Sequence, residues 1–257
     1  MSYLQTESIR TEWVQQVRAN LQTWGYYYEP DFCTEIADAE SIITAARLLG
    51  YLYDPNEPVI LTQPSPKATQ NRVFDRGAGI GWHNDFSSRA GRPEVSLSLI
   101  RQGDPSGVYG GAWRVASTTE VLSKLSQTRK GKQLISELVK HAEPFGYRDK
   151  GGWQPFRVII GANSRLSRLG LRFYKRPLEE GAWLRFGQIP ERTRDMITRI
   201  EEAADAVGET LPATTGALLI VDNRLSLHDR IVQQVTGPKE QRRQAWLCFV
   251  KKLYQPL

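Results

Sequence analysis

Cysteine is scarce in this chain. Only Cys33 and Cys248 occur among the 257 residues, in unrelated segments and without a spacing typical of metal ligands. This argues against a disulfide-stapled scaffold and indicates two reduced, buried, small apolar side chains. Long apolar stretches are missing too, because no run approaches the ~20 residues that cross a bilayer and the N-terminus has no apolar signal segment. We therefore expect a cytoplasmic protein with no membrane partner.

Acidic residues are outnumbered by basic ones. Lys and Arg total 34 against 28 Asp and Glu, which gives a formal net charge of +6 and a pI of about 9.3. The excess gathers between 164 and 199, where the basic residues are Arg165, Arg168, Arg172, Lys175, Arg176, Arg185, Arg192, Arg194 and Arg199. This run is either a solvated basic face or a surface that attracts an anionic substrate or an acidic partner. No known nucleic-acid-binding signature accompanies it, so nucleic acid is not the expected partner.

Helical and strand-like patterns alternate along the chain. Helices are expected at 8–24, 38–50, 116–125, 131–141 and 189–208, and Ser117 with Glu120 has capping-box spacing. Short strands are expected at 58–63, 72–76, 94–101, 155–161, 170–175, 182–187, 210–213, 216–223, 224–230 and 242–254. No repeat or linker divides the chain. We expect one α+β domain over 1–257, with a helical N-terminal part at 1–55, a β-core at 56–115 and 152–257, and a helical insert at 116–151.

Histidine is rare enough to be informative, because only His83, His141 and His228 are present. His141 ends an amphipathic helix, where a structural role is sufficient. His83 lies two residues before Asp85 in "GIGWHNDFSS", so an extended strand would place both side chains on one face. His228 follows the apolar run and turn of "GALLIVDNRLSL". Each motif alone is weak, but two imidazoles and one carboxylate make up the facial triad typical of non-haem Fe(II) oxygenases.

Three motifs in the same order are more specific than any one of them. The segments "GAGIGWHNDFS", "GALLIVDNRLSLHDR" and "QRRQAWLCFV" resemble the taurine dioxygenase and clavaminate synthase-like branch of the Fe(II)/2-oxoglutarate-dependent oxygenases, over roughly residues 75–250. The resemblance implies a double-stranded β-helix core, of the jelly-roll or cupin-like kind, with flanking and inserted helices. It also implies that His83, Asp85 and His228 hold the catalytic Fe(II).

The same resemblance points to a co-substrate site. The family has an arginine for 2-oxoglutarate shortly after the distal histidine, and a guanidinium can grip a carboxylate through two hydrogen bonds. Arg242 and Arg243 both fall in that window, and the alternation of the last strand favours Arg243. The family's Gly-Gly turn matches "GGAWRV". Trp113, however, stands where a threonine of the family often supports the carboxylate. Either another hydroxyl, such as that of Ser96 or Ser98, takes its place, or the match to the family is in a different register here.

The implied activity is that of a dioxygenase. It consumes 2-oxoglutarate and O2 and hydroxylates an unactivated C–H bond, although desaturation or cyclisation can branch from the same chemistry. Asp85 favours oxygenation over halogenation, because halogenases of the superfamily have a small residue there. The expected substrate is a small anionic molecule of specialised metabolism: an amino acid, a nucleotide, or an intermediate tethered to an acidic carrier protein. The candidates to line its pocket are Phe86, Ser87, Ser88 and Trp113.

Two alternatives stay open from the residues alone. One is a non-catalytic double-stranded β-helix protein with a binding or regulatory role, which would not need an intact triad and a candidate arginine together. The other is a zinc-dependent hydrolase, which would need a general base beside an activated water. No separate motif for such a base is visible in the sequence.

Overall fold

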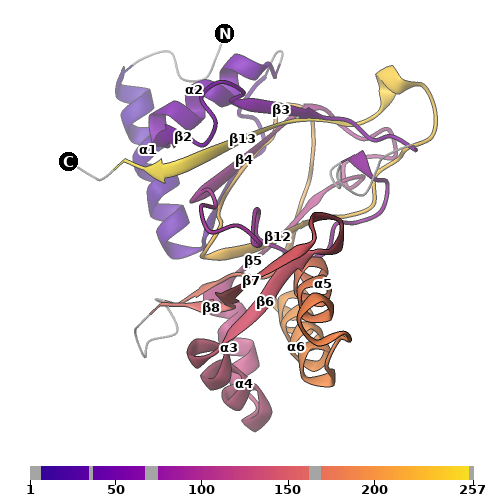
Figure 1. The fold of residues 1–257 in the computed structure, drawn as a ribbon. Helices are drawn as coiled ribbons and strands as arrows, with labels where there is room; N and C mark the ends of the chain where they lie inside the picture. The colour runs from indigo at the N-terminus through magenta and orange to yellow at the C-terminus, as the bar shows by residue number, and fades with distance from the viewer. Residues whose placement is uncertain (1–6, 35–36, 67–74, 162–168, 255–257) are drawn as a thin grey trace.

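The computed structural model describes residues 7–34, 37–66, 75–161 and 169–254 (Figure 1). Its N-terminal part holds the elements α1 (Glu7–Thr23), β1 (Tyr26–Glu29), α2 (Ala39–Leu49), β2 (Gly50–Leu52) and β3 (Val59–Thr62). Both helices expected in this part are confirmed. The short strands β1 and β2 were not expected.

Six antiparallel strands form the larger sheet. Its path is β1-β11-β4-β13-β2, with β3 also pairing with β13, and its remaining strands are β4 (Val95–Gln102), β11 (Leu218–Asp222) and β13 (Gln244–Leu253). Alternation along β4 gives the sheet two different faces, because successive side chains point to opposite sides. Leu97 and Leu99 pack in the apolar cluster that α1 and α2 cover. Ser96 and Ser98 face a cavity on the other side.

A smaller antiparallel sheet lies across that cavity. Its order is β10-β5-β12, formed by β10 (Glu209–Leu211), β5 (Trp113–Ser117) and β12 (Ser226–Arg230). His83 extends this sheet through a single antiparallel bridge to His228 and meets Tyr174 through a second one. Residues of both sheets line the cavity, so the space between the two sheets positions the candidate site.

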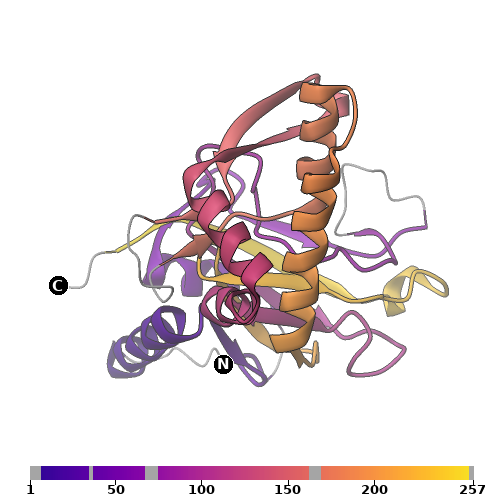
Figure 2. The same cartoon turned by 90° about the horizontal axis from the view of Figure 1, so that it is seen from below.

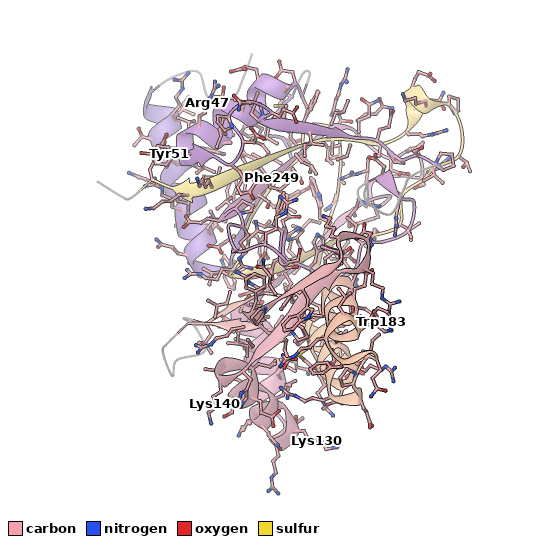
Figure 3. All side chains as sticks on the ribbon, viewed as in Figure 1. Arg47, Tyr51, Lys130, Lys140, Trp183 and Phe249 are labelled. Carbon is pink, nitrogen blue, oxygen red and sulfur yellow. The ribbon has the colours of Figure 1, made fainter. Side chains whose placement is uncertain are left out.

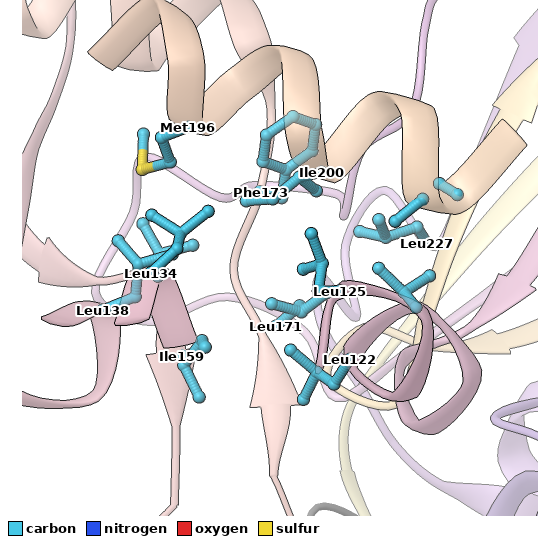
Figure 4. Close-up of a cluster of buried hydrophobic side chains, with 14 of the residues drawn as sticks. Leu122, Leu125, Leu134, Leu138, Ile159, Leu171, Phe173, Met196, Ile200 and Leu227 are labelled. Atoms are coloured by element: carbon cyan, nitrogen blue, oxygen red, sulfur yellow. The ribbon is translucent and has the colours of Figure 1, made fainter. Parts of the chain in front are cut away.

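Four helices pack together on the side of the molecule away from α1 and α2 (Figures 1 and 2). They are α3 (Thr118–Ser126), α4 (Arg129–Lys140), α5 (Lys175–Phe186) and α6 (Glu191–Val207). Two hairpins accompany them: β6 (Ala142–Tyr147) with β7 (Gly152–Arg157), and β8 (Ile159–Ile160) with β9 (Gly170–Leu171). Short 3-10 helices occupy Arg148–Lys150 and Lys239–Gln241. Leu122, Leu134, Phe173, Met196 and Ile200 belong to the apolar core of this part (Figure 4).

One expected strand is wrong. Residues 182–186 belong to α5 and Gly187 caps it; the buried positions of this helix, 177, 178, 181 and 182, repeat at helical spacing. Gly181 lets α5 approach β6, since a Cβ there would lie 2.4 Å from the carbonyl oxygen of Pro144. The strand expected at 170–175 shrinks to β9, and Tyr174 beyond it bridges to His83. Aromatic residues in "AWLRFG" suggested a strand, but packing against the hairpin selects the helix.

The structure differs from the elements expected from sequence in several smaller ways. The segment expected as a helical insert, 116–151, ends in β6, and the part expected as β-core contains α5 and α6. Ser117 precedes α3, but its side chain makes no capping hydrogen bond. Of the strand expected at 72–76, residues 72–74 lie outside the described residues, and Asp75 and Arg76 are not in a strand.

The described part of the chain is a mixed α/β fold with antiparallel sheets. Cys33 and Cys248 are both free; Cys248 is buried as expected, whereas Cys33 is only half-buried. None of the helices among the described residues is long and apolar enough to cross a membrane.

Candidate metal centre and adjoining cavity

The structure brings His83, Asp85 and His228 together, with potential ligand atoms that all lie within 4.8 Å of one another. Asp85 Oδ1 is 3.7 Å from His83 Nε2, and Asp85 Oδ2 is 3.3 Å from His228 Nε2. The centroids of the two imidazole rings are 4.3 Å apart. Within the described ranges, no other group of three or more His, Cys, Asp or Glu side chains is arranged to hold a metal ion.

Backbone pairing places the two histidines side by side. His83 N–H donates to His228 O at 2.9 Å, and His228 N–H donates back to His83 O at 3.0 Å. The carbonyl oxygen of Gly81 lies 2.8 Å from His83 Nδ1, so this nitrogen carries the proton and Nε2 faces Asp85 with a free lone pair. The buried Nδ1 of His228 has no such partner among the described residues. The ring of His83 is therefore the more firmly oriented of the two.

Two buried asparagines hold the turn that carries Asp85. Asn84 Nδ2 donates to Ser226 O at 2.7 Å, and Asn84 Oδ1 accepts the N–H of Phe173 at 2.8 Å. Asn223 Oδ1 accepts the N–H of Asp85 at 3.0 Å. The expectation of an extended strand through His83 and Asp85 is thus wrong, since a turn brings the carboxylate round. Both asparagines lie inside the motifs, yet only their turn-forming residue type hinted at this role.

Phe86 follows Asp85 in a left-handed backbone conformation. Its φ of 53° is positive, which no other non-glycine residue in the described ranges shares. Such strain persists only where the surroundings over-determine it, and it clusters at functional sites. Here the ring of Phe86 packs against Tyr53 and against Phe249, at centroid distances of 5.2 and 5.1 Å. The packing keeps Asp85 turned toward the histidines.

The three side chains shift one another's protonation. Burial would raise the pKa of Asp85, but the two imidazoles hold it far below its ordinary value. Burial would likewise lower the pKa of His83, but the neighbouring carboxylate of Asp85 raises it overall. Burial and the neighbouring His83 lower the pKa of His228. An ionised carboxylate beside a neutral imidazole is a donor set suited to a divalent metal ion.

The cavity extends from this cluster to a buried arginine. Its walls come from both sheets, and with the open mouth it holds about 480 Å³ of empty space. Arg243 lines it at only 3% exposure, and its Nε has no hydrogen-bond partner among the described residues. Burial and the nearby cation of Arg230 lower the pKa of Arg243 to about 9. A buried cation without a paired carboxylate is costly, so this end of the cavity is suited to an anion.

Of the other residues predicted for the co-substrate site, the two serines line the cavity and Arg242 does not. Arg242 points away from the cavity and donates to Gly237 O at 2.8 Å and Pro64 O at 3.2 Å. Ser96 and Ser98 both line the cavity. The Ser96 hydroxyl already accepts a hydrogen bond from Asn223 at 2.8 Å, so Ser98 is the freer of the two serines.

The candidate substrate residues are dispersed. Trp113 lines the cavity at its arginine end, with the guanidinium of Arg243 5.9 Å from its ring centroid. Phe86 lies beside the cavity rather than in its wall. Ser87 is buried with an unpartnered hydroxyl among the described residues, and Ser88 lines a neighbouring pocket. Of the four, only Trp113 lines the cavity of the metal cluster.

A carboxylate that the motifs did not reveal supports the cluster from behind. Asp229 is 3% exposed, its Oδ1 accepts the N–H of Gly81 at 2.8 Å, and its Oδ2 accepts two N–H groups of Arg114 at 3.0 and 2.7 Å. Gly81 is also the residue whose carbonyl oxygen orients His83. Asp229 therefore positions Gly81, whose carbonyl oxygen orients the ring of His83.

Replacing Asp229 with alanine is expected to lower Fe(II) affinity by about 10–100-fold, as losses of outer-shell partners typically do. It also leaves the Gly81 N–H unpartnered, at a cost of about 1–3 kcal/mol in unfolding free energy. Asp229→Asn keeps an acceptor for Gly81 and should retain most of the metal affinity. Metal titration and urea unfolding of the metal-free protein measure the two effects. Unchanged affinity in Asp229→Ala would show that the His83 ring is held without it.

Comparison with known proteins gives matches by structure only. No protein-family model and no curated protein matches the sequence. An asparagine oxygenase, solved with Fe(II), 2S,3S-3-hydroxyasparagine and succinate, superposes with a TM-score of 0.70 at 18% identity, over 95% of this chain and 79% of that one. PvcB from Pseudomonas aeruginosa gives 0.66 at 16% identity, over 92% and 79%. The non-heme iron oxygenase OrfP, solved with Fe, succinate and (3S)-hydroxy-L-Arg, gives 0.63 at 11% identity, over 95% and 80%.

These neighbours share one cofactor chemistry. PvcB is an Fe, α-ketoglutarate-dependent oxygenase from an isonitrile synthetic pathway, and OrfP has also been solved with Fe and α-ketoglutaric acid. At these identities the likeness establishes the fold. The chain has the fold of Fe/2-oxoglutarate-dependent oxygenases, as its motifs predict.

Proposed function

We propose that this protein is an Fe(II)- and 2-oxoglutarate-dependent dioxygenase with a double-stranded β-helix core, in a single domain spanning 1–257. One observation carries the proposal. The cluster of His83, Asp85 and His228 opens into the same cavity as Arg243, a buried arginine that pairs with no carboxylate among the described residues. One cavity thus offers a site for a metal ion at one end and a site for an anion at the other.

The residues fit the implied cofactors. Two imidazole nitrogens and one carboxylate leave open positions on a six-coordinate iron, which is the donor set of non-haem Fe(II) oxygenases. Bound iron with 2-oxoglutarate would supply O2 activation coupled to oxidative decarboxylation, with succinate and CO2 as products. The protein's own task is to orient and enclose these groups.

Each side chain has a role in that task. His83 offers Nε2 to the metal, because its Nδ1–H is held by Gly81. Arg243 binds the far carboxylate of 2-oxoglutarate, and the Ser98 hydroxyl is close enough to the cavity to take the place of the missing threonine. Trp113 and Leu247 line the cavity with apolar surface, so they exclude water from the arginine once the co-substrate is bound.

The substrate we propose is a small, anionic molecule, with an amino acid favoured over a nucleotide or a carrier-tethered intermediate. The asparagine oxygenase and OrfP structures hold hydroxylated amino acids, which supports hydroxylation of a C–H bond as the outcome here. We place the enzyme in the specialised metabolism of the cytoplasm. A non-catalytic β-helix protein is disfavoured, because it would have no use for both the triad and a buried, unpaired Arg243.

Anaerobic titration tests the proposal directly. Fe(II)-loaded protein is titrated with 2-oxoglutarate while the visible metal-to-ligand charge-transfer absorption is recorded, and succinate release is then measured in air. We expect a saturable absorption band and slow succinate formation even without substrate. A folded, iron-loaded protein that shows neither would contradict the oxygenase function and favour the binding protein.

A further inference from the structure

We infer that a second pocket, between the turn at 85–89 and the β6–β7 hairpin, binds an anionic group of the substrate; this rests on the proposed function. The pocket lies against the turn that begins at Asp85. None of its lining residues lines the cavity of Arg243, so an anion bound here would not compete with 2-oxoglutarate.

The lining is polar and basic. Its residues are Ser88, Arg89, Phe145, Gly146, Tyr147, Lys150, Gly152, Trp153 and Gln154, and none of them is acidic. The pocket is open at its mouth and has a volume of about 250 Å³, slightly below the ~300–1,000 Å³ usual for whole small-molecule sites. Two cations, two hydroxyls and one indole thus surround a space of the right size for part of a small substrate.

The two cations have no carboxylate partner in the described part of the chain. The guanidinium of Arg89 lies 4.9 Å from the ring centroid of Phe86, and Lys150 Nζ lies 5.0 Å from that of Tyr147. Arg176, which also faces Tyr147, differs because its Nε bonds to Glu180 at 2.7 Å. Glu180 therefore neutralises Arg176, whereas Arg89 and Lys150 remain available to a ligand.

The hydroxyl groups are placed to donate. Tyr147 and Ser88 both line the pocket, and burial raises the pKa of Tyr147, so its hydroxyl stays protonated. A protonated phenol between two cations is a donor for a carboxylate, sulfate or phosphate oxygen. The turn itself is held by Arg172, whose Nη1 lies 3.4 Å from Ser87 O and 3.3 Å from Arg89 O.

The pocket is next to the metal cluster along the turn, because Ser88 and Arg89 of its lining follow Asp85 by three and four residues. Tyr174 packs against His83 at a ring-centroid distance of 5.2 Å, on the side of the cluster that the backbone bridge between these two residues defines. A substrate anchored by Arg89 and Lys150 would therefore extend past Tyr174 toward the metal. The anchored group would set which carbon is presented for oxidation.

Two tryptophans allow both anion sites to be observed in one experiment. The full-length protein is labelled with ¹⁵N at the tryptophan indoles and loaded with Zn(II), a diamagnetic substitute for Fe(II). Trp153, which lines the pocket, and Trp113, which lies under Arg243, are assigned from Trp153→Phe and Trp113→Phe. Sulfate and acetate are titrated separately as phosphate-like and carboxylate-like probes, and 2-oxoglutarate is titrated as the reference ligand.

We expect at least one of the two probes to shift the Trp153 resonance saturably, and the better probe identifies the anionic group. Arg89→Gln and Lys150→Gln should each weaken this binding about tenfold, the effect of losing one charge-assisted contact. Lys140→Gln is the matched control, because Lys140 is an exposed cation at the end of α4 and is not among the residues that line the pocket (Figure 3). Its titration should equal that of the wild type.

The outcomes separate this inference from the proposed function. If 2-oxoglutarate shifts Trp113 but neither probe shifts Trp153 saturably, or if Lys140→Gln weakens binding as much as Arg89→Gln, the pocket is not an anion site and the co-substrate site stands. If a probe shifts Trp153 in an Arg89-dependent way and 2-oxoglutarate leaves Trp113 unmoved, the anion site stands and the proposed co-substrate site fails.

Discussion

Replacing His83 with alanine is expected to weaken Fe(II) binding by at least about a hundredfold and to abolish 2-oxoglutarate-dependent succinate formation. Loss of a side chain that only hydrogen-bonds to a metal ligand changes metal affinity by about 10–100-fold, and His83 would bond to the ion itself. The variant should still fold, because the bridge of residue 83 to His228 is made by backbone atoms, which alanine keeps. Fe(II) titration and a succinate assay give the two measurements.

The chain offers a matched control for this substitution. His141→Ala removes the same side chain at the exposed C-terminal end of α4, in the helical part of the molecule away from the cavity. Its metal affinity and succinate formation should equal those of the wild type, with a stability change of about 1 kcal/mol or less. Equal losses in both variants, or undiminished iron binding in His83→Ala, would contradict the assignment of the metal centre.

Replacing Arg243 with glutamine is expected to raise the Kd for 2-oxoglutarate by about 30–150-fold. This corresponds to losing about 2–3 kcal/mol of charge-assisted hydrogen bonding in a buried site. The metal cluster lies at the other end of the cavity, so Fe(II) affinity should stay within about threefold of the wild type. Titration of the iron-loaded variant with 2-oxoglutarate, followed by its absorption band, measures the effect.

Arg242→Gln is the control one residue away. Arg242 donates to backbone carbonyls outside the cavity, so its loss should leave the Kd for 2-oxoglutarate nearly unchanged. Unfolding experiments add a second contrast. Arg243→Met removes a buried cation without a carboxylate partner and should leave the melting temperature unchanged or raise it, although it removes co-substrate binding. If Arg242→Gln raised the Kd for 2-oxoglutarate strongly and Arg243→Gln changed it little, Arg242 would be the arginine that binds the co-substrate.

The residues of the candidate centre were predictable because the chemistry limits the choice. Only three histidines were available, and one of them, His141, had a sufficient explanation at a helix end. Period-two alternation predicted for a last strand at 242–254 separated Arg243 from Arg242. The observed strand β13 begins only at Gln244, so both arginines directly precede it. The structure puts Arg243 in the cavity and Arg242 outside it.

The supporting residues were not predictable by the same means. Asp229, Asn84 and Asn223 act through partners that are distant in sequence, such as Gly81 for Asp229 and Phe173 for Asn84. A single sequence contains no signal for such pairs. The basic run at 164–199 was expected to be either a solvated face or a surface that attracts an anion. Arg165 and Arg168 of this run lie outside the described residues, and Arg176 pairs with Glu180. The cations of the proposed anion pocket, Arg89 and Lys150, lie outside the run.

The chemical groups of the site, the positions of most helices and the strands with clear alternation could be read from residue type and local period. The turn through which Asp85 reaches the histidines and the helix at 182–186 became apparent only in the folded molecule. It alone showed that Ser88 lines a pocket separate from Arg243. The physical reason is that burial and long-range hydrogen bonds outweigh local preference wherever two distant segments pack together.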